Sequence, residues 1–288
     1  MKPIFIGVAT ALVTPFCEEG VDLEALSVLL DRQIAAGVGA VVLAGTTGES
    51  PTLTYEEYEK MILFAKARIG GRIPLIVGCG ANCTARACEL AEIAERCGAD
   101  GLLAVTPYYN KATLPGLFLH YEAITEASKL PVIVYNVPSR TGLALGMEHY
   151  RMLAKLPGIQ GVKEASGDLS LLSALASEFG ERFAIYTGND EQAVPAMRLG
   201  ARGVISVYSN IEPREMRELT DACLAGDFGK ADRLNLRLCA KFRSLFWEVN
   251  PIPVKFVLSA RGLCKPLWRL PLCPPTDDTA RRLDKLWN

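Results

Sequence analysis

One local pattern recurs eight times along the first 224 residues of this 288-residue chain. Each unit is a short apolar run, a polar or glycine-rich turn, an amphipathic helix and a glycine. The first run covers residues 7–13, and its helix begins after Asp22, a favourable N-cap residue, and ends before Gly37. The runs are apolar throughout rather than alternating, which is typical of parallel strands covered on both faces. The pattern therefore predicts eight parallel strands, each followed by a helix.

The seven later runs have the same design and end in loops of polar residues and glycine. They cover residues 40–44, 73–77, 101–105, 131–134, 157–163, 183–186 and 203–207. Eight strand-helix units in succession favour an α/β fold of the closed (β/α)8 TIM-barrel type. A doubly wound open sheet is the alternative, but it normally has fewer units and a nucleotide-binding fingerprint. The sequence has neither Gly-x-Gly-x-x-Gly after a strand nor a phosphate loop ending in Gly-Lys-Ser/Thr.

The alternation stops after residue 224. The remaining sequence predicts helices near residues 227–247, 253–261 and 276–287, with proline-rich connections between them. This part is short for a second domain. We therefore expect a catalytic barrel over residues 1–224 and a C-terminal helical region, residues 225–288, packed on it.

Composition limits the kinds of partner. The net charge is -1, without a long block of one sign, which argues against nucleic acid or an anionic membrane as the main partner. Residues 1–7 lack the apolar run of a signal peptide, and no stretch is apolar enough to span a bilayer. The nine cysteines form no Cys-x-x-Cys pair, and we expect both histidines, His120 and His149, on helix surfaces. These features predict a cytoplasmic protein without a metal or a cofactor.

Lys163 is unusual because it ends the sixth predicted strand, and lysines usually avoid buried strand positions. A buried amine loses its proton more readily than a solvated one and can then attack a carbonyl to form a Schiff base. The alternative is a lysine whose side chain extends from the strand end to solvent. Lys255 is a rival nucleophile, but it lies in the helical tail, where we expect a structural role.

Other side chains collect at the same edge, because the carboxyl ends of all barrel strands form one rim. Seven residues that follow strands are not explained by turn formation alone. They are Thr46, Thr47, Tyr108, Tyr109, Tyr135, Arg140 and Gly188. Each could be an ordinary loop or core residue. Together with the lysine they supply an amine nucleophile, a phenol, hydroxyl and backbone N–H groups for a carboxylate, and a guanidinium for a second one. This set favours carbonyl chemistry on a keto acid.

Four segments carry a resemblance to one family. They are residues 45–50 (GTTGES), 106–110 (TPYYN), 135–142 (YNVPSRTG) and 162–168 (VKEASGD). The chain resembles the dihydrodipicolinate synthase (4-hydroxy-tetrahydrodipicolinate synthase) family from Gly7 to at least Pro275. Pyruvate-dependent lyases such as N-acetylneuraminate lyase and keto-deoxy-sugar-acid aldolases share the first loop and the lysine, and Arg140 favours the synthases among them. A barrel that has lost catalysis and senses a keto acid is a third hypothesis.

The resemblance implies a mechanism. Lys163 would form a Schiff base with pyruvate, and Thr46 and Thr47 would bind the pyruvate carboxylate. Tyr135 would be the general acid/base, with protons relayed through the Thr46 hydroxyl to Tyr109 of a neighbouring subunit. Arg140 would bind the carboxylate of the second substrate, L-aspartate 4-semialdehyde.

The resemblance also bears on assembly and regulation. It places carbonyl oxygens near Gly188 and Ile205 where they would orient the amine of the second substrate. It also implies a homotetramer built as a dimer of dimers. Asn82 and Tyr108 match an allosteric lysine site found in some members. Arg86 stands where that site has a glutamate, so lysine regulation is not expected here, since like charges repel.

Overall fold

Eight parallel strands close into a barrel in the computed structural model, which describes residues 3–287. Their order around the barrel is β1-β10-β9-β8-β7-β6-β5-β4. They are β1 (Gly7–Ala11), β4 (Ala40–Leu43), β5 (Leu75–Gly78), β6 (Gly101–Val105), β7 (Val132–Asn136), β8 (Ile159–Glu164), β9 (Ala184–Thr187) and β10 (Gly203–Ser206). The predicted (β/α)8 TIM barrel is confirmed. A small antiparallel hairpin of β2 (Phe16–Cys17) and β3 (Gly20–Val21) was not predicted.

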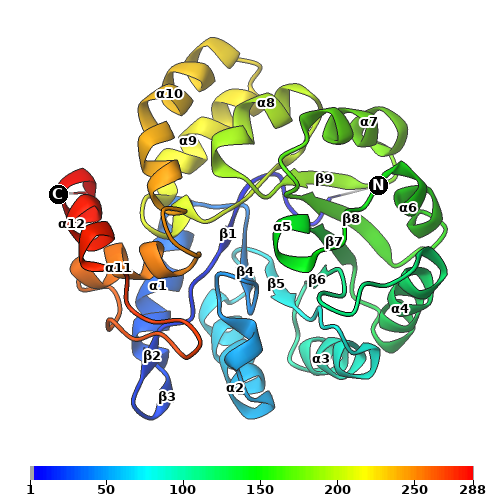
Figure 1. Cartoon of the computed structure of the whole chain (residues 1–288), viewed down its shortest axis with the longest axis horizontal. Coiled ribbons are helices and arrows are strands. Elements are labelled where there is room, and N and C mark those ends of the chain that lie inside the picture. The colour runs from blue at the N-terminus through cyan, green and yellow to red at the C-terminus, as the bar shows by residue number, and fades with distance from the viewer. Residues whose placement is uncertain (1–2, 288) are drawn as a thin grey trace.

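Helices surround the barrel (Figure 1). They are α1 (Leu23–Ala36), α2 (Tyr55–Ile69), α3 (Thr84–Arg96), α4 (Leu114–Ala127), α6 (Met147–Leu153), α7 (Leu169–Phe179), α8 (Ala193–Arg198) and α9 (Pro213–Leu224). The predicted start at Asp22, which caps α1, is confirmed, and Thr54 and Glu57 form a capping box on α2. The short helix α5 (Pro138–Thr141) lies where the sequence predicted a loop. Three 3-10 turns are η1 (Ser50–Thr52), η2 (Asp190–Gln192) and η3 (Tyr208–Asn210).

The C-terminal helices α10 (Phe228–Ser244), α11 (Ile252–Ala260) and α12 (Asp277–Trp287) agree with the three predicted ones. In Figure 1, α10 lies beside α8 and α9, while α11 and α12 lie together at the side of α1. The indole nitrogen of Trp287 donates to Ser244 Oγ at 3.0 Å and so links α12 to α10. Within residues 3–287, no helix has both the length and the apolar character required to cross a bilayer.

Two apolar cores follow from the alternation of side chains along each strand. One lies between the strands and the helices, and includes Val132 and Val134 of β7. The other fills the barrel interior, and includes Ile133 and Tyr135 of the same strand. In the interior, the ring of Tyr186 stacks on Phe5 at a centroid distance of 4.1 Å. Side chains of β8 and β9 that pair with these interior residues therefore point into the barrel.

The expectation that His120 lies on a helix surface is wrong. It belongs to α4 but is buried, and its Nδ1 lies 2.9 Å from Thr84 Oγ1. Burial lowers the pKa of His120 to about 4, because the charged imidazolium is poorly solvated there. His149 lies on α6 and is partly buried, with its Nδ1 accepting from the Gly146 N–H at 3.1 Å.

Closure of the barrel predicts a strict requirement for glycine at position 203. Gly203 on β10 pairs with Gly7 on β1, and a Cβ there would lie 1.8 Å from the Gly7 carbonyl oxygen. We expect Gly203→Ala to lower the free energy of unfolding by about 3 kcal/mol, as overpacking does elsewhere. Urea unfolding followed by circular dichroism measures this.

The matched control is Gly146→Ala, because a Cβ at Gly146 meets nothing within 4 Å and its φ is -110°. This variant should lose about 1 kcal/mol or less, since only the preference for glycine over alanine at the N-cap of α6 is lost. Equal stability of both variants would show that the β1–β10 contact is not close-packed.

Candidate active site

Lys163 on β8 projects into the barrel interior. It pairs in register with Tyr135 on β7 and Tyr186 on β9, both of which belong to the interior core. Only 6% of Lys163 is exposed, and its Nζ lies 4.1 Å from the centroid of the Tyr135 ring. The alternative of a lysine extending to solvent is therefore wrong. Tyr135 itself lies within β7 rather than in the following loop, because β7 extends to Asn136.

Gly188 lies directly against the Lys163 side chain. A Cβ at Gly188 would be 2.8 Å from Lys163 Cε and 2.6 Å from Ala165 Cβ, so any larger residue would displace the amine. Its N–H donates to the Glu164 carbonyl at 2.9 Å, which keeps the end of β9 close to β8. Ile205, on β10, is fully buried in the interior core. The structure thus brings Lys163, Tyr135, Gly188 and Ile205 into one region.

A buried carboxylate supports the Lys163–Tyr135 pair from outside the barrel, and sequence reasoning missed it. Glu164 follows Lys163 and accepts hydrogen bonds from Asn136 Nδ2 at 2.9 Å, Tyr150 Oη at 2.8 Å and Ser166 N at 2.7 Å. Burial and the nearby carboxylate raise the pKa of Tyr150, which therefore stays a donor. The sequence did contain a signal for this network: Glu164 is a charged residue at the end of a buried strand, and Asn136 ends the neighbouring strand.

A second buried carboxylate lies near the lysine, on η2. Asp190 Oδ2 accepts from the N–H groups of Val207 and Tyr208 at 3.0 and 2.9 Å. Burial raises the pKa of Asp190, and the positive charge of Lys163 opposes this effect. Asp190 therefore fixes the chain after β10.

The loop carrying Thr46 and Thr47 has a constrained backbone. It is bounded by Ala44 at φ 49° and Glu49 at φ 53°, a left-handed conformation that costs a non-glycine residue roughly 1–2 kcal/mol. Thr47 is buried, whereas Thr46 is half-buried and lines a cavity. The loop therefore needs support from its surroundings to keep this shape.

Lys255 provides part of that support and has the structural role that the sequence predicted. Its Nζ lies 2.6 Å from Glu49 Oε1, and both side chains are completely buried. Burial lowers the pKa of the Lys255 amine, while the Glu49 carboxylate opposes this effect. No small substrate can reach this amine without opening the ion pair.

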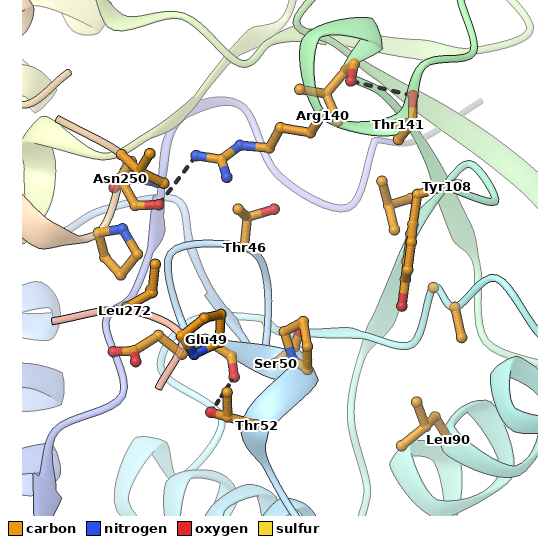
Figure 2. Close-up of a pocket in the computed structure, with 18 of the residues that line it drawn as sticks. Thr46, Glu49, Ser50, Thr52, Leu90, Tyr108, Arg140, Thr141, Asn250 and Leu272 are labelled. Atoms are coloured by element: carbon orange, nitrogen blue, oxygen red, sulfur yellow. Dashed lines mark hydrogen bonds between the residues drawn. The ribbon is translucent and has the colours of Figure 1, made fainter. Parts of the chain in front are cut away.

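A cavity of about 300 Å³ opens at the carboxyl ends of the strands. In Figure 2, Arg140 reaches across it from α5, above Thr46, toward Asn250. The Arg140 guanidinium donates to the Asn250 carbonyl oxygen at 3.1 Å, and Asn250 Nδ2 donates to Thr47 Oγ1 at 2.9 Å. Asn250 thus connects the two groups predicted to bind carboxylates. Nothing in the sequence pattern indicated this contact.

The two adjacent tyrosines point in different directions. Tyr108 lines the cavity opposite Thr46, whereas Tyr109 is 90% exposed and has a left-handed backbone with φ 73°. Of the two, Tyr108 is the one that faces the cavity of its own barrel. Near them, the Asn82 carbonyl oxygen accepts from Asn110 at 2.9 Å.

Arg86, which the resemblance places at the glutamate position of the allosteric site, packs on a tyrosine of α2. The Arg86 guanidinium stands over the Tyr55 ring, 5.8 Å from its centroid, and also lines the cavity. As for metal sites, residues 3–287 contain no cluster of three or more His, Cys, Asp or Glu side chains with a suitable arrangement.

The fold and the site define a class: (β/α)8-barrel lyases with a lysine inside the barrel on the sixth barrel strand. A model of the dihydrodipicolinate synthetase family matches residues 4–288. The 4-hydroxy-tetrahydrodipicolinate synthase of Thermoanaerobacter sp. (strain X514) is 46% identical over 276 residues, which cover 96% of this chain and 93% of that protein. The chain therefore belongs to the dihydrodipicolinate synthetase family.

Solved structures agree with this assignment. The crystal structure of dihydrodipicolinate synthase from Aquifex aeolicus superposes with a TM-score of 0.95 at 41% identity, covering 98% of this chain and 97% of that one. The structure of the enzyme from Cyanidioschyzon merolae with lysine bound has a TM-score of 0.93 at 35% identity, covering 99% and 97%.

The network around Glu164 predicts a measurable loss of stability. Tyr150→Phe removes one donor from a buried carboxylate and should lower the free energy of unfolding by about 2–3 kcal/mol. Tyr121→Phe is the control, since the Tyr121 hydroxyl donates to the neutral Ala104 carbonyl at 3.0 Å and should contribute about 1 kcal/mol. Urea unfolding of both variants gives the comparison. A larger loss for Tyr121→Phe would mean that the carboxylate does not depend on Tyr150.

Proposed function

We propose that this chain condenses pyruvate with L-aspartate 4-semialdehyde to give 4-hydroxy-tetrahydrodipicolinate, a step in lysine and diaminopimelate biosynthesis. The observation that carries this proposal is the amine of Lys163, which is buried in the barrel interior against the Tyr135 ring. Named relatives support the substrates, since curated proteins 46% identical over most of their length are 4-hydroxy-tetrahydrodipicolinate synthases.

The chemistry begins at Lys163. Its neutral amine adds to the ketone carbon of pyruvate, and loss of water leaves an imine. The imine makes the methyl group acidic, and loss of a proton from it gives an enamine. Tyr135 is next to the amine and acts as the acid/base, while Thr46 extends the proton path toward the cavity. The enamine carbon then attacks the aldehyde. The amine of the second substrate closes the ring at the imine carbon and releases Lys163.

We assign the carboxylates of the two substrates, pyruvate and aspartate semialdehyde, to opposite sides of the cavity. The Thr46–Thr47 loop presents hydroxyl and N–H groups to pyruvate, and such loops suit an anion. Arg140 faces the cavity, and the one hydrogen bond of its guanidinium within residues 3–287 goes to the Asn250 carbonyl oxygen, so the rest of the guanidinium remains for a carboxylate. Carbonyl oxygens of Gly188 and Ile205 lie in the same region as Lys163 and orient the amine of aspartate semialdehyde.

A coupled assay tests substrate choice through Arg140. The parent protein should consume pyruvate with aspartate semialdehyde and show no turnover with N-acetylmannosamine, the aldol partner of the N-acetylneuraminate lyases. Arg140→Ala should lower kcat/KM for aspartate semialdehyde about 100-fold, equivalent to about 2.7 kcal/mol, because a charge-assisted fork is lost. Imine formation with pyruvate should survive. Turnover with N-acetylmannosamine, or an unaffected Arg140→Ala variant, would favour the lyase alternative.

We further propose that the active form is a homodimer in the cytoplasm, with two dimers pairing into a tetramer. Tyr109 supports the dimer, because a tyrosine that is 90% exposed leaves its aromatic ring in water unless a partner covers it. Its place beside the cavity also suits it to reach into a partner's site. A two-fold interface lets each subunit complete the other's proton relay. Nine unpaired cysteines support a reducing compartment.

Mixing two inactive variants tests the shared site. Tyr109→Phe lacks the relay and Lys163→Ala lacks the nucleophile, so each alone should retain little activity. After dissociation and reassociation, a hybrid dimer has one site with an intact lysine and an intact partner tyrosine. Activity should return to about a quarter of the parent value, since half of the dimers are hybrids with one working site each. Hybrids that form, as seen by native mass spectrometry, but stay inactive would place Tyr109 in its own subunit's site.

A further inference from the structure

The Thr46–Thr47 loop is tied to the C-terminal region of the chain. Glu49, at the end of this loop, is buried, and its Oε1 lies 2.6 Å from Lys255 Nζ on α11. Its Oε2 accepts from the backbone N–H of Arg269 at 3.1 Å. The loop is thus fixed by residues more than 200 positions away, which belong to the part of the chain that follows the eight strand-helix units.

Arg269 and Phe16 complete the surroundings of this ion pair. Arg269 donates to the Thr52 carbonyl at 2.8 Å and to Glu57 Oε2 at 2.6 Å, and so also holds the start of α2. Lys255 Nζ lies 4.5 Å and the Arg269 guanidinium 4.2 Å from the centroid of the Phe16 ring. The pair is closed off from water, so salt screens it little.

The geometry of the Lys255–Glu49 ion pair favours a role in positioning the loop over a role in stabilising the fold. A buried ion pair typically adds little stability compared with apolar packing, but it fixes the place of both charged groups. Glu49 has a left-handed backbone, and its N–H donates to the Thr46 carbonyl oxygen at 3.1 Å. A change in the Glu49 backbone conformation would therefore also move Thr46. Asn250, from the same C-terminal region, adds a second tie to Thr47.

We propose that Lys255, acting through Glu49, is a positioning residue for the loop that binds the pyruvate carboxylate. The inference rests on the proposed function, because it assigns the loop to pyruvate. Lys255 touches no substrate. It keeps the Thr46 and Thr47 groups in the arrangement that the carboxylate requires, and its loss lets Glu49 relax from its strained backbone conformation.

Trapping of the pyruvate imine tests this proposal. Borohydride reduces the imine irreversibly, so the trapping rate at increasing pyruvate gives a half-saturating concentration and a maximal rate. For Lys255→Met we expect the half-saturating pyruvate concentration to rise about tenfold, with a maximal rate within about twofold of the parent, because the nucleophile is untouched. A purely structural role would instead lower the maximal rate through the folded fraction and leave half-saturation unchanged.

Two further variants keep the result interpretable. Glu49→Gln retains an oxygen acceptor for Lys255 and Arg269 but loses the charge. We expect this variant to fold, and its half-saturating pyruvate concentration to rise about threefold. Lys66→Met is the control, since it removes an exposed ion pair with Asp100 (2.7 Å) on the outside of the barrel. Its half-saturating pyruvate concentration should equal that of the parent.

The outcomes separate this inference from the proposed function. Unchanged half-saturation in folded Lys255→Met and Glu49→Gln overturns the positioning role and leaves the proposed function intact. A parent protein that traps no pyruvate overturns the proposed function, and the positioning role with it. If Lys255→Met does not fold, Glu49→Gln alone decides, with circular dichroism confirming its fold.

Discussion

The pairing of β7 with β8 is the constraint on which the rest of the site depends. Because Tyr135 pairs with Lys163 and Asn136 with Glu164, the first pair faces the barrel interior and the second faces the helices. A shift by one residue would exchange these faces, placing the carboxylate inside and the amine outside. The hydrogen bonds of Glu164 to Asn136 and Tyr150 hold the register from behind. The Lys163 amine is thus oriented by a buried polar network that lies outside the cavity lining.

The site is also built from both ends of the chain. Barrel strands supply Lys163 and Tyr135, while the loop after β4 supplies the threonines. The C-terminal region contributes Asn250, Lys255 and Arg269, which contact that loop or Arg140. The C-terminal region therefore does more than cover the barrel, because it also holds Arg140 and the Thr46–Thr47 loop in place.

Much of this could be predicted from sequence, because local signals were strong. The apolar strands and helix signals such as the N-cap at Asp22 indicated the order of elements, and eight units made a closed barrel the simplest solution. The position of Lys163 at a strand end identified the nucleophile candidate.

The strand end beyond Tyr135 and the helix at Arg140 were missed, since polar residues and Pro138 resemble a loop. The burial of His120 was missed because one helix turn does not reveal which neighbour covers it. Contacts such as Lys255 with Glu49 join positions 206 apart, and no local pattern encodes such a distance.

The central claim is that Lys163, and no other lysine, forms the imine. The most direct measurement is peptide mapping by mass spectrometry after borohydride reduction with pyruvate. The account predicts one reduced pyruvate adduct on the peptide containing Lys163, no adduct in Lys163→Ala, and loss of activity in proportion to labelling. An adduct on Lys255, or activity that survives complete labelling, would contradict it.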